Sequence, residues 1–397
     1  GGTLGLIAAR IENTGTLMAP QGTVALGAGS RVRLSLGGLV SLDVEQGAVD
    51  ALIEQGGAIR ADGGLVYLGA KAVGDITQTV INHTGVTQAQ TLATGQDGEI
   101  YLMGDMNHGQ INVAGLLDAS APNGGDGGFI ETSAAHVNIT EETRVTTLAA
   151  QGQTGEWLID PQDYTIAASG GDITGSQLSS NLGGSNITIQ SISGGTDNGT
   201  AGDINVNDTV TWSANKLTLN AQNNININAN LNGSGTASLA LEYGQSSSGG
   251  GAASYNVNNP VNLPAGSNFS TKKGTTGSII NYTVITALGS QGSTTGSDLQ
   301  GMNGTLSGNY ALGANVNASI TASWNASAGF DPIGDGTSNF TGAFDGLGHV
   351  ITGLTINRPS EDNVGLFGAV SGVTISNIGL TGGSVIGKSS VGSLAGS

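Results

Sequence analysis

The sequence predicts an all-β chain folded as a parallel β-helix, a solenoid in which short strands stack coil upon coil. Composition is the first observation, because 69 of the 397 residues are glycine and only 10% are charged, whereas a helical bundle draws on Ala, Leu, Glu and Lys. The second is that short segments alternate apolar with polar residues, which is the period of a strand. The third is that these segments recur in register. A segment this short cannot bury its own apolar face, so successive copies are expected to stack.

The repeats are clearest in the first third of the chain. Three pairs of segments match. Residues 11–28 match 53–70 at an offset of 42, residues 81–104 match 111–134 at an offset of 30, and residues 2–8 match 22–28 at an offset of 20. The shared skeleton is two short strands, G-x-L-x-A and G-x-V-x-L-x-A, joined by turns. Residues 1–150 are therefore expected to form one β-helical stretch.

The skeleton also predicts which side chains face inward and which residues form corners. The inward column is expected to contain Leu4, Leu6, Val24, Leu26, Val66, Leu68, Ile100 and Leu102. Glycines that recur at the strand ends are expected to supply positive φ at tight corners, namely Gly15, Gly57, Gly85 and Gly115.

The middle of the chain, residues 151–242, continues the pattern with Asn in place of Gly. The segment 203–211 (DINVNDTVT) is echoed by 224–232 (NININANLN), with Ile204 and Ile225 in equivalent positions. Asparagines at equivalent turns are expected to hydrogen-bond their amides from coil to coil.

Two later segments differ in composition. Residues 243–278 are rich in Ser, Gly and Asn and contain Pro260 and Pro264, which predicts a loop or linker. Residues 279–397 contain a different β repeat, VGLFG and VGSLAG, which stops unfinished and is expected to continue in the native protein.

Charge and residue usage exclude several classes of partner. Eleven basic against 29 acidic residues give a net charge of −18, so nucleic acid and anionic membrane would be repelled. No apolar run approaches the roughly 18–20 residues that span a bilayer. The chain has no cysteine, which excludes disulfides and fits export of an unfolded chain from a bacterium.

The segments GTVALGA, GEWLIDPQDYTI and DINVNDTVTWSANKLTLN resemble filamentous haemagglutinin-type exoproteins of bacterial two-partner secretion, over roughly residues 1–245. From Tyr310 onward, FTGAFDGLGHVITGLTI and NVGLFG resemble the GLUG-type repeat of large bacterial surface proteins.

The resemblance implies a secreted, rod-like adhesin at the bacterial cell surface, with a right-handed β-helix. Its implied partners are an outer-membrane two-partner secretion transporter and, for attachment, a host surface glycan or protein or a matrix polysaccharide. The amino-terminal secretion motifs of that family are absent, so recognition of the transporter is assigned to no residue here.

Parallel β-helices also occur as polysaccharide lyases and hydrolases, which makes a carbohydrate-active enzyme the alternative. The candidate acidic groups are Asp160 and Asp163 beside Pro161, and Asp331, Asp335 and Asp345 with His349 nearby. Aspartate beside glycine or proline is typical of tight turns, so these are interpreted as turn residues and no catalytic residue is assigned.

The remaining candidates are interpreted as structural, so no metal or cofactor is expected. Four scattered histidines, His83, His108, His136 and His349, show no metal-ligand spacing. The single NGGDGG segment at 123–128 is interpreted as a loop, because a calcium-binding roll needs several stacked copies. The aromatic residues weighed as a sugar-stacking surface are interpreted mainly as core, namely Trp157, Trp212, Trp324, Tyr243 and Tyr310. No residue is assigned to ligand binding.

Overall fold

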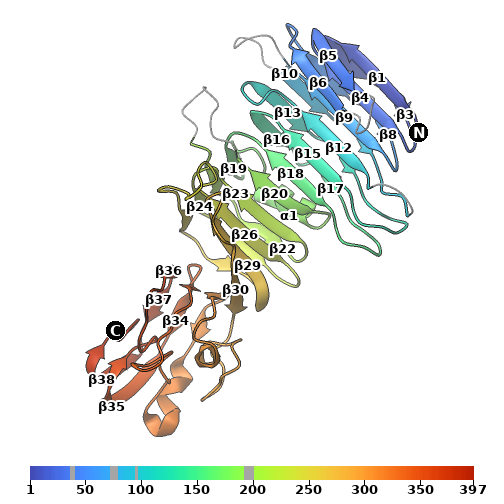
Figure 1. Ribbon diagram of the computed structural model, residues 1–397. Helices are drawn as coiled ribbons and strands as arrows, with labels where there is room; N and C mark the ends of the chain where they lie inside the picture. The colour runs from blue at the N-terminus through green and yellow to red at the C-terminus, as the bar shows by residue number, and fades with distance from the viewer. Residues whose placement is uncertain (36–40, 72–78, 94–96, 192–200) are drawn as a thin grey trace. The chain divides into compact units, whose positions relative to one another are not determined.

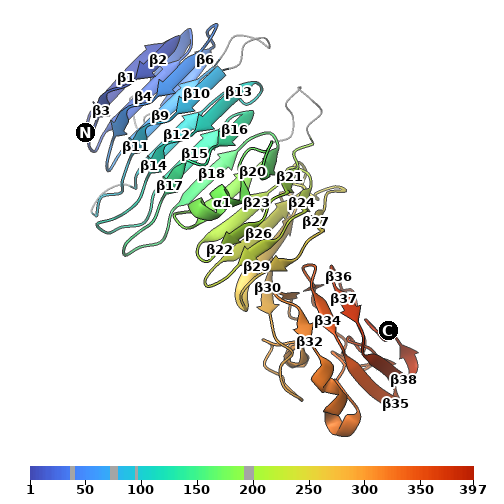
Figure 2. The ribbon, with the colours of Figure 1, turned by 180° about the vertical axis from the view of Figure 1, so that it is seen from behind.

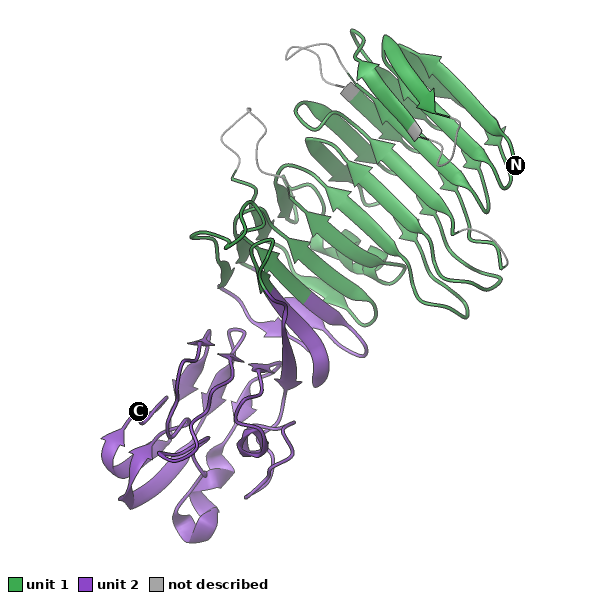
Figure 3. Cartoon of the chain, viewed as in Figure 1, with its two compact units in different colours: residues 1–228, 240–256, 272–277 green, residues 229–239, 257–271, 278–397 purple. Residues whose placement is uncertain are grey.

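A computed structural model describes residues 1–35, 41–71, 79–93, 97–191 and 201–397. The chain divides into two compact units, coloured separately in Figure 3. Unit 1 comprises Gly1–Asn228, Ala240–Asn256 and Lys272–Gly277, and unit 2 comprises Ala229–Leu239, Val257–Thr271 and Ser278–Ser397.

Strands dominate both units, which confirms the all-β prediction, and most of them pair in parallel. Within the described residues the one α-helix is the short α1 (Gly175–Leu182), which starts at the N-cap Thr174. No helix in the described part of the chain is long and apolar enough to cross a membrane.

Unit 1 contains three series of parallel strands that the chain visits in turn (Figure 1; Figure 2 gives the view from behind). The long sheet contains β1 (Thr3–Ala8), β4 (Thr23–Ala28), β9 (Leu65–Ala70), β12 (Glu99–Met103), β15 (Phe129–Ser133), β18 (Glu156–Asp160), β20 (Asn186–Gln190) and β23 (Lys216–Asn220). The second contains β2 (Arg10–Asn13), β7 (Leu52–Gln55), β10 (Thr79–His83), β13 (Gly109–Val113) and β16 (His136–Ile139). The third contains β3 (Thr16–Met18), β8 (Ala58–Arg60), β11 (Val86–Gln88), β14 (Leu116–Asp118) and β17 (Arg144–Thr146).

Shorter strands follow the same order farther along the chain. These are β19 (Tyr164–Ile166), β21 (Ile204–Val206), β22 (Val210–Trp212), β24 (Ile225–Ile227) and β25 (Leu231–Gly233), whereas β26 (Ser238–Tyr243) continues the long sheet beside β23. Ile204 pairs with Ile225, so the offset read between the two Asn-rich segments is a strand register.

The repeat offsets of the first part are strand registers as well. Val24 pairs with Val66 at the offset of 42, and Ile81 pairs with Ile111 at the offset of 30. Parallel pairing in register places like side chains above one another, which produces continuous aliphatic columns.

The predicted inward column is largely confirmed. Six of its members are fully buried: Val24, Leu26, Val66, Leu68, Ile100 and Leu102. Leu4 is half-buried and Leu6 is 41% exposed, because β1 pairs only with β4 in the described residues and has no strand on its other side.

Gly57, Gly85 and Gly115 are required for a reason other than the one predicted, whereas a Cβ on Gly15 would meet no atom closer than 4.0 Å. Gly15, Gly57, Gly85 and Gly115 do not have positive φ. A Cβ on Gly85 would instead lie 2.0 Å from the carbonyl oxygen of Gly57, and one on Gly115 would lie 2.1 Å from that of Gly85. Stacked corners bring backbone against backbone, so the requirement is steric and not torsional.

An antiparallel hairpin that the repeats did not predict covers part of the long sheet. It consists of β5 (Arg31–Ser35) and β6 (Ser41–Gln46), closed by an Arg33–Glu45 ion pair. A Cβ on Gly27 of β4 would meet the side chains of Val32 and Leu42, so glycine there lets the hairpin pack closely.

The segment 243–278 differs from the loop or linker expected. Turns with positive-φ glycines occupy its first part, but three strands follow, β27 (Tyr255–Val257), β28 (Val261–Asn262) and β29 (Gly266–Lys273). Pro260 and Pro264 lie between or beside strands, where a missing N–H costs no ladder bond.

Unit 2 has its own aromatic core, with Phe330, Phe340, Phe344 and Phe367 buried. Besides β25, β28 and most of β29, its strands are β30 (Ile280–Ile285), β31 (Tyr310–Leu312), β32 (Val316–Asn317), β33 (Phe344–Asp345), β34 (Val350–Thr352), β35 (Thr355–Val364), β36 (Ile375–Ser376), β37 (Gly379–Thr381) and β38 (Ser384–Val391). Short 3-10 helices occupy Gln300–Gly304, Ser319–Ser323 and Asn325–Ser327.

Candidate ligand-binding site

Aromatic side chains gather on the outward face of the long sheet in unit 1. Tyr67 of β9 and Tyr101 of β12 are paired residues, and their ring centroids lie 5.9 Å apart. The Phe129 ring of β15 follows, 5.8 Å from that of Tyr101. All three side chains are half-buried, and they form one aromatic row across three strands.

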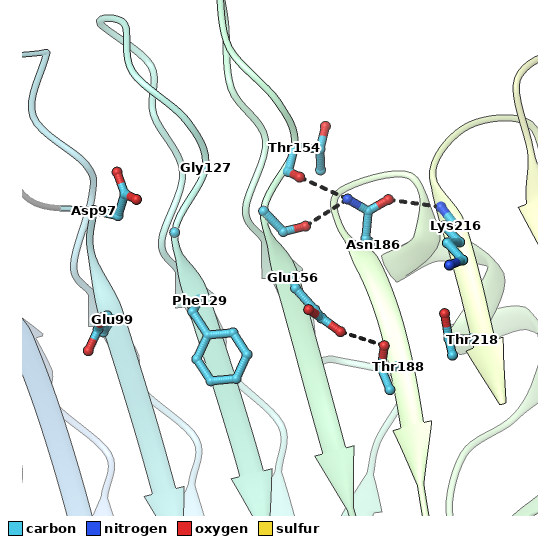
Figure 4. A pocket seen from close by; sticks show the side chains of 12 residues that line it. Asp97, Glu99, Gly127, Phe129, Thr154, Glu156, Asn186, Thr188, Lys216 and Thr218 are labelled. Atoms are coloured by element: carbon cyan, nitrogen blue, oxygen red, sulfur yellow. Dashed lines mark hydrogen bonds between the residues drawn. The ribbon is translucent and has the colours of Figure 1, made fainter. Parts of the chain in front are cut away.

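A trough of about 510 Å³ lies over the same face, at the amino-terminal ends of its strands (Figure 4). Its lining comes from β12, β15, β18, β20 and β23 and the turns before them: Asp97, Glu99, Gly127, Gly128, Phe129, Thr154, Gly155, Glu156, Asn186, Thr188, Lys216 and Thr218. The Phe129 ring presents its face to the viewer in Figure 4, between the carboxylates of Glu99 and Glu156.

Hydrogen bonds fix several of these side chains. The Tyr101 hydroxyl donates to Glu99 Oε2 at 3.2 Å, and the Thr188 hydroxyl donates to Glu156. Asn186 Nδ2 donates to the carbonyl oxygens of Thr154 and Gly155, at 2.8 and 3.0 Å, and its Oδ1 accepts the backbone N–H of Lys216. The trough is therefore preformed.

Burial and nearby carboxylates perturb the two tyrosines. Burial, with the charges of Glu131 and Asp43, raises the pKa of Tyr67 to about 12. Burial and the charge of Glu99 raise the pKa of Tyr101 to about 12 as well. Both phenols stay protonated at physiological pH and lie in a locally negative field.

A second carboxylate pair lies farther along the same face. Asp160, at the end of β18, is 8% exposed, and its Oδ1 atom has no hydrogen-bond partner. Its Oδ2 accepts from Gln190 Nε2 at 3.3 Å, while Glu131 accepts from the Ser133 hydroxyl at 2.7 Å. Burial and then the charge of Glu131 raise the pKa of Asp160 to about 7.

Asp163, unlike Asp160, lies in the bend after Pro161, although its hydrogen bonds reach the next coil. Its Oδ1 accepts the backbone N–H groups of Gly202 and Asp203, at 2.7 and 3.0 Å. The NGGDGG segment is also a turn as interpreted, with Gly124 and Gly125 at positive φ and Asp126 accepting the N–H of Gln153.

The three aspartates of unit 2 have separate structural roles. Asp335 accepts the N–H groups of Thr337 and Ser338, both at 2.7 Å, and Asp345 accepts that of Leu347 at 2.8 Å. Asp331 instead pairs with Arg358 at 3.0 Å. The turn interpretation is confirmed for Asp335 and Asp345.

The histidines are dispersed. His349 binds the Val261 carbonyl through Nε2 at 2.9 Å and approaches Asn315 Oδ1 through Nδ1 at 3.3 Å. His83 is buried against the Thr87 hydroxyl, and burial lowers its pKa to about 4. His108 lies in the turn before β13 and His136 is exposed on β16. Among the residues that the structure describes, no group of three or more His, Asp or Glu is placed to hold a metal ion.

The aromatic residues weighed from the sequence are mostly core. Trp157, Trp212, Trp324 and Tyr310 are buried, as interpreted. Tyr243 is half-buried and packs edge-on against Tyr255, with the Lys273 ammonium group over its ring.

The sequence did not lead us to Tyr67, Tyr101 or Phe129, although a signal was present. Tyr67 stands in Val-Tyr-Leu and Tyr101 in Ile-Tyr-Leu, so each lies between two inward aliphatic residues and must point outward. Aligning these triplets as neighbouring coils would have placed the rings together.

No family model matches the chain. Over 89 residues it is 43% identical to "Halomucin" of Haloquadratum walsbyi (strain DSM 16790 / HBSQ001), a match that covers 20% of this chain and 1% of that protein.

Proposed function

We propose that this chain is part of a secreted, cell-surface adhesin of the filamentous haemagglutinin type, which attaches a bacterium to host cells, other bacteria or biofilm matrix. In this proposal the three parallel series of unit 1 form a right-handed β-helix, and the chain leaves the cell through an outer-membrane two-partner secretion transporter. The ligand is a surface glycan or protein or a matrix polysaccharide.

The observation that carries the proposal is the aromatic row with its trough on the outward face of the long sheet. Parallel strands in register hold these side chains on a rigid backbone, so little conformational entropy is lost on binding. An 89-residue stretch of the chain is 43% identical to part of halomucin, a much longer protein. This match supports a chain that is part of a large protein.

One observation favours a carbohydrate-active enzyme as a second candidate. Asp160 has a raised pKa and lies near Glu131 on the same outward face, and an acid beside an ionised carboxylate is the pair that glycosidases use. Asp160 is nearly buried, however, so a substrate would have to displace neighbouring side chains to reach it.

The test exposes the purified chain to intact cells and to a panel of insoluble polysaccharides. Co-sedimentation without release of reducing ends or unsaturated sugars is the result expected of an adhesin. Sugar release that disappears in Asp160→Asn would establish the enzyme, with Asp208→Asn as a control that changes a carboxylate elsewhere. Absence of both binding and product would contradict both functions.

A further inference from the structure

We propose that the trough over β12, β15, β18, β20 and β23 binds a polysaccharide that carries free amino groups, such as a partly deacetylated amino-sugar polymer. The inference rests on the adhesive function proposed above and names the site and the ligand chemistry for it.

The first argument is the shape and chemistry of the trough floor. The Phe129 ring turns its face away from the sheet in Figure 4, and Gly127, Gly128 and Gly155 place no side chain on the turns at its amino-terminal side. An aromatic face of this kind packs against the C–H face of a sugar ring. Tyr101, at 5.8 Å from Phe129, extends the apolar surface to the next strand.

The second argument is charge. Asp97 and Glu99 line one side of the Phe129 ring and Glu156 lines the other, while the one cation of the lining, Lys216, lies at the far end. Ammonium groups on a sugar chain would face these carboxylates, and carboxylates or sulfates would be repelled. A chain with a net charge of −18 reinforces that preference.

The third argument separates a polysaccharide from a basic peptide. Between Glu156 and Lys216 the lining is hydroxyl and amide, from Thr154, Thr188, Thr218 and Asn186. These groups suit the hydroxyls of a sugar chain that continues past the acidic part. A lysine-rich peptide would use the carboxylates alone.

The experiment titrates the full chain with a glucosamine hexamer, the fully N-acetylated hexamer, hexalysine and a hyaluronan oligosaccharide. The glucosamine hexamer should bind at least about tenfold more tightly than its N-acetylated form. Added salt should lower its affinity, because salt screens exposed ion pairs. Equal or tighter binding of hexalysine would show a peptide site, and preferential binding of hyaluronan would overturn the charge argument.

Two variants locate the binding. Phe129→Ala should weaken glucosamine hexamer by about two- to tenfold through loss of stacking. Glu99→Gln combined with Glu156→Gln preserves shape and should remove the preference over the N-acetylated hexamer. Glu12→Gln, on the exposed face of β2, is the matched control and should change nothing. Melting temperatures check that each variant is folded.

The outcomes also separate this inference from the adhesive function. In one outcome, cells or matrix co-sediment with folded Phe129→Ala as they do with the original chain, and the hexamers do not bind. The trough is then not the binding site, although the proposed adhesive function is retained. If no surface is bound while the hexamer binds through Phe129, the adhesin proposal fails and the site remains. Hexamer binding that neither variant changes would overturn the inference.

Discussion

Leu68 shows how strongly a single core residue is constrained. It is fully buried and lies in register between Leu26 of β4 and Leu102 of β12. Leu68→Asp would place a carboxylate among aliphatic side chains, so we expect a loss of about 4 kcal/mol or more in the free energy of unfolding.

Denaturant unfolding checks this prediction. Val49→Asp is the matched control, since Val49 is 68% exposed and the same change there should shift stability by less than about 0.5 kcal/mol. Equal midpoints for the two variants would refute the inward assignment.

Asp160 should make folding stability depend on pH. Its pKa is about 7 in the folded chain and about 3.9 when unfolded, so between these values the folded state binds more protons. Stability therefore falls as the pH rises from about 4 to 7, by on the order of 2 kcal/mol.

The variant Asp160→Asn keeps the side-chain shape without the charge. Its unfolding free energy should exceed that of the original chain at pH 8 and differ least near pH 4. Because other carboxylates titrate in both proteins, the difference between the two pH profiles is the measurement, and parallel profiles would rule out the buried acid.

At the scale of elements, the stacked corners depend on glycine. Gly85→Ala would put a Cβ 2.0 Å from the Gly57 carbonyl oxygen. This clash is with backbone of the neighbouring coil, so it is relieved only if the backbone moves. We expect a loss of about 1–3 kcal/mol or more. Gly15→Ala is the control, because the nearest atom to its Cβ would be 4.0 Å away, and a thermal melt of the two variants should separate them clearly.

Amide ladders connect successive coils, as predicted for the Asn-rich segments, but most of them lie within strands and not at the turns expected, and they extend to the earlier coils. In the second series Asn82 donates to Glu54, Asn112 to Asn82, and Asn138 to Asn112, at 2.8, 2.8 and 3.0 Å. In the later coils Asn226 donates to Asn205 at 2.9 Å.

The variant Asn112→Ala tests the ladder, because it removes two of the ladder's hydrogen bonds, those to Asn82 and from Asn138. We expect the free energy of unfolding to fall by about 1–2 kcal/mol. Asn107→Ala is the comparison, because Asn107 lies in an exposed turn and its hydrogen bonds come from its backbone. Urea midpoints that coincide for the two variants would show that the ladder adds no stability.

At the scale of the whole molecule, charge limits the partners. A net charge of −18, from 11 basic and 29 acidic residues, opposes the binding of a polyanion and the counterion release that would drive it. We therefore expect the chain to flow through a heparin column at physiological salt and to leave a DNA duplex unshifted in a gel. Retention that a raised salt concentration reverses would contradict this expectation.

The sequence by itself determined the repeated strands of unit 1 and their registers, but not the β5–β6 hairpin or the strands within 243–278. Period two and the recurrence of like residues are local properties, so Val24 with Val66 and Ile81 with Ile111 were paired correctly. Strand propensity and inward apolar positions depend on a few neighbouring residues, which is why most of the core column was also right.

Only the tertiary structure decided what the outward residues do. Alignment of the Val-Tyr-Leu and Ile-Tyr-Leu triplets places Tyr67 beside Tyr101, but the diagonal contact of Tyr101 with Phe129 and the trough depend on coil geometry that the sequence pattern does not carry. Gln88, for example, lies on the outward side of β11, and its amide donates to both carboxylate oxygens of Asp62. The burial of Asp160 likewise results from packing between strands. Residues distant in the sequence decide how much solvent reaches a side chain and which charges lie near it, so local sequence does not predict either.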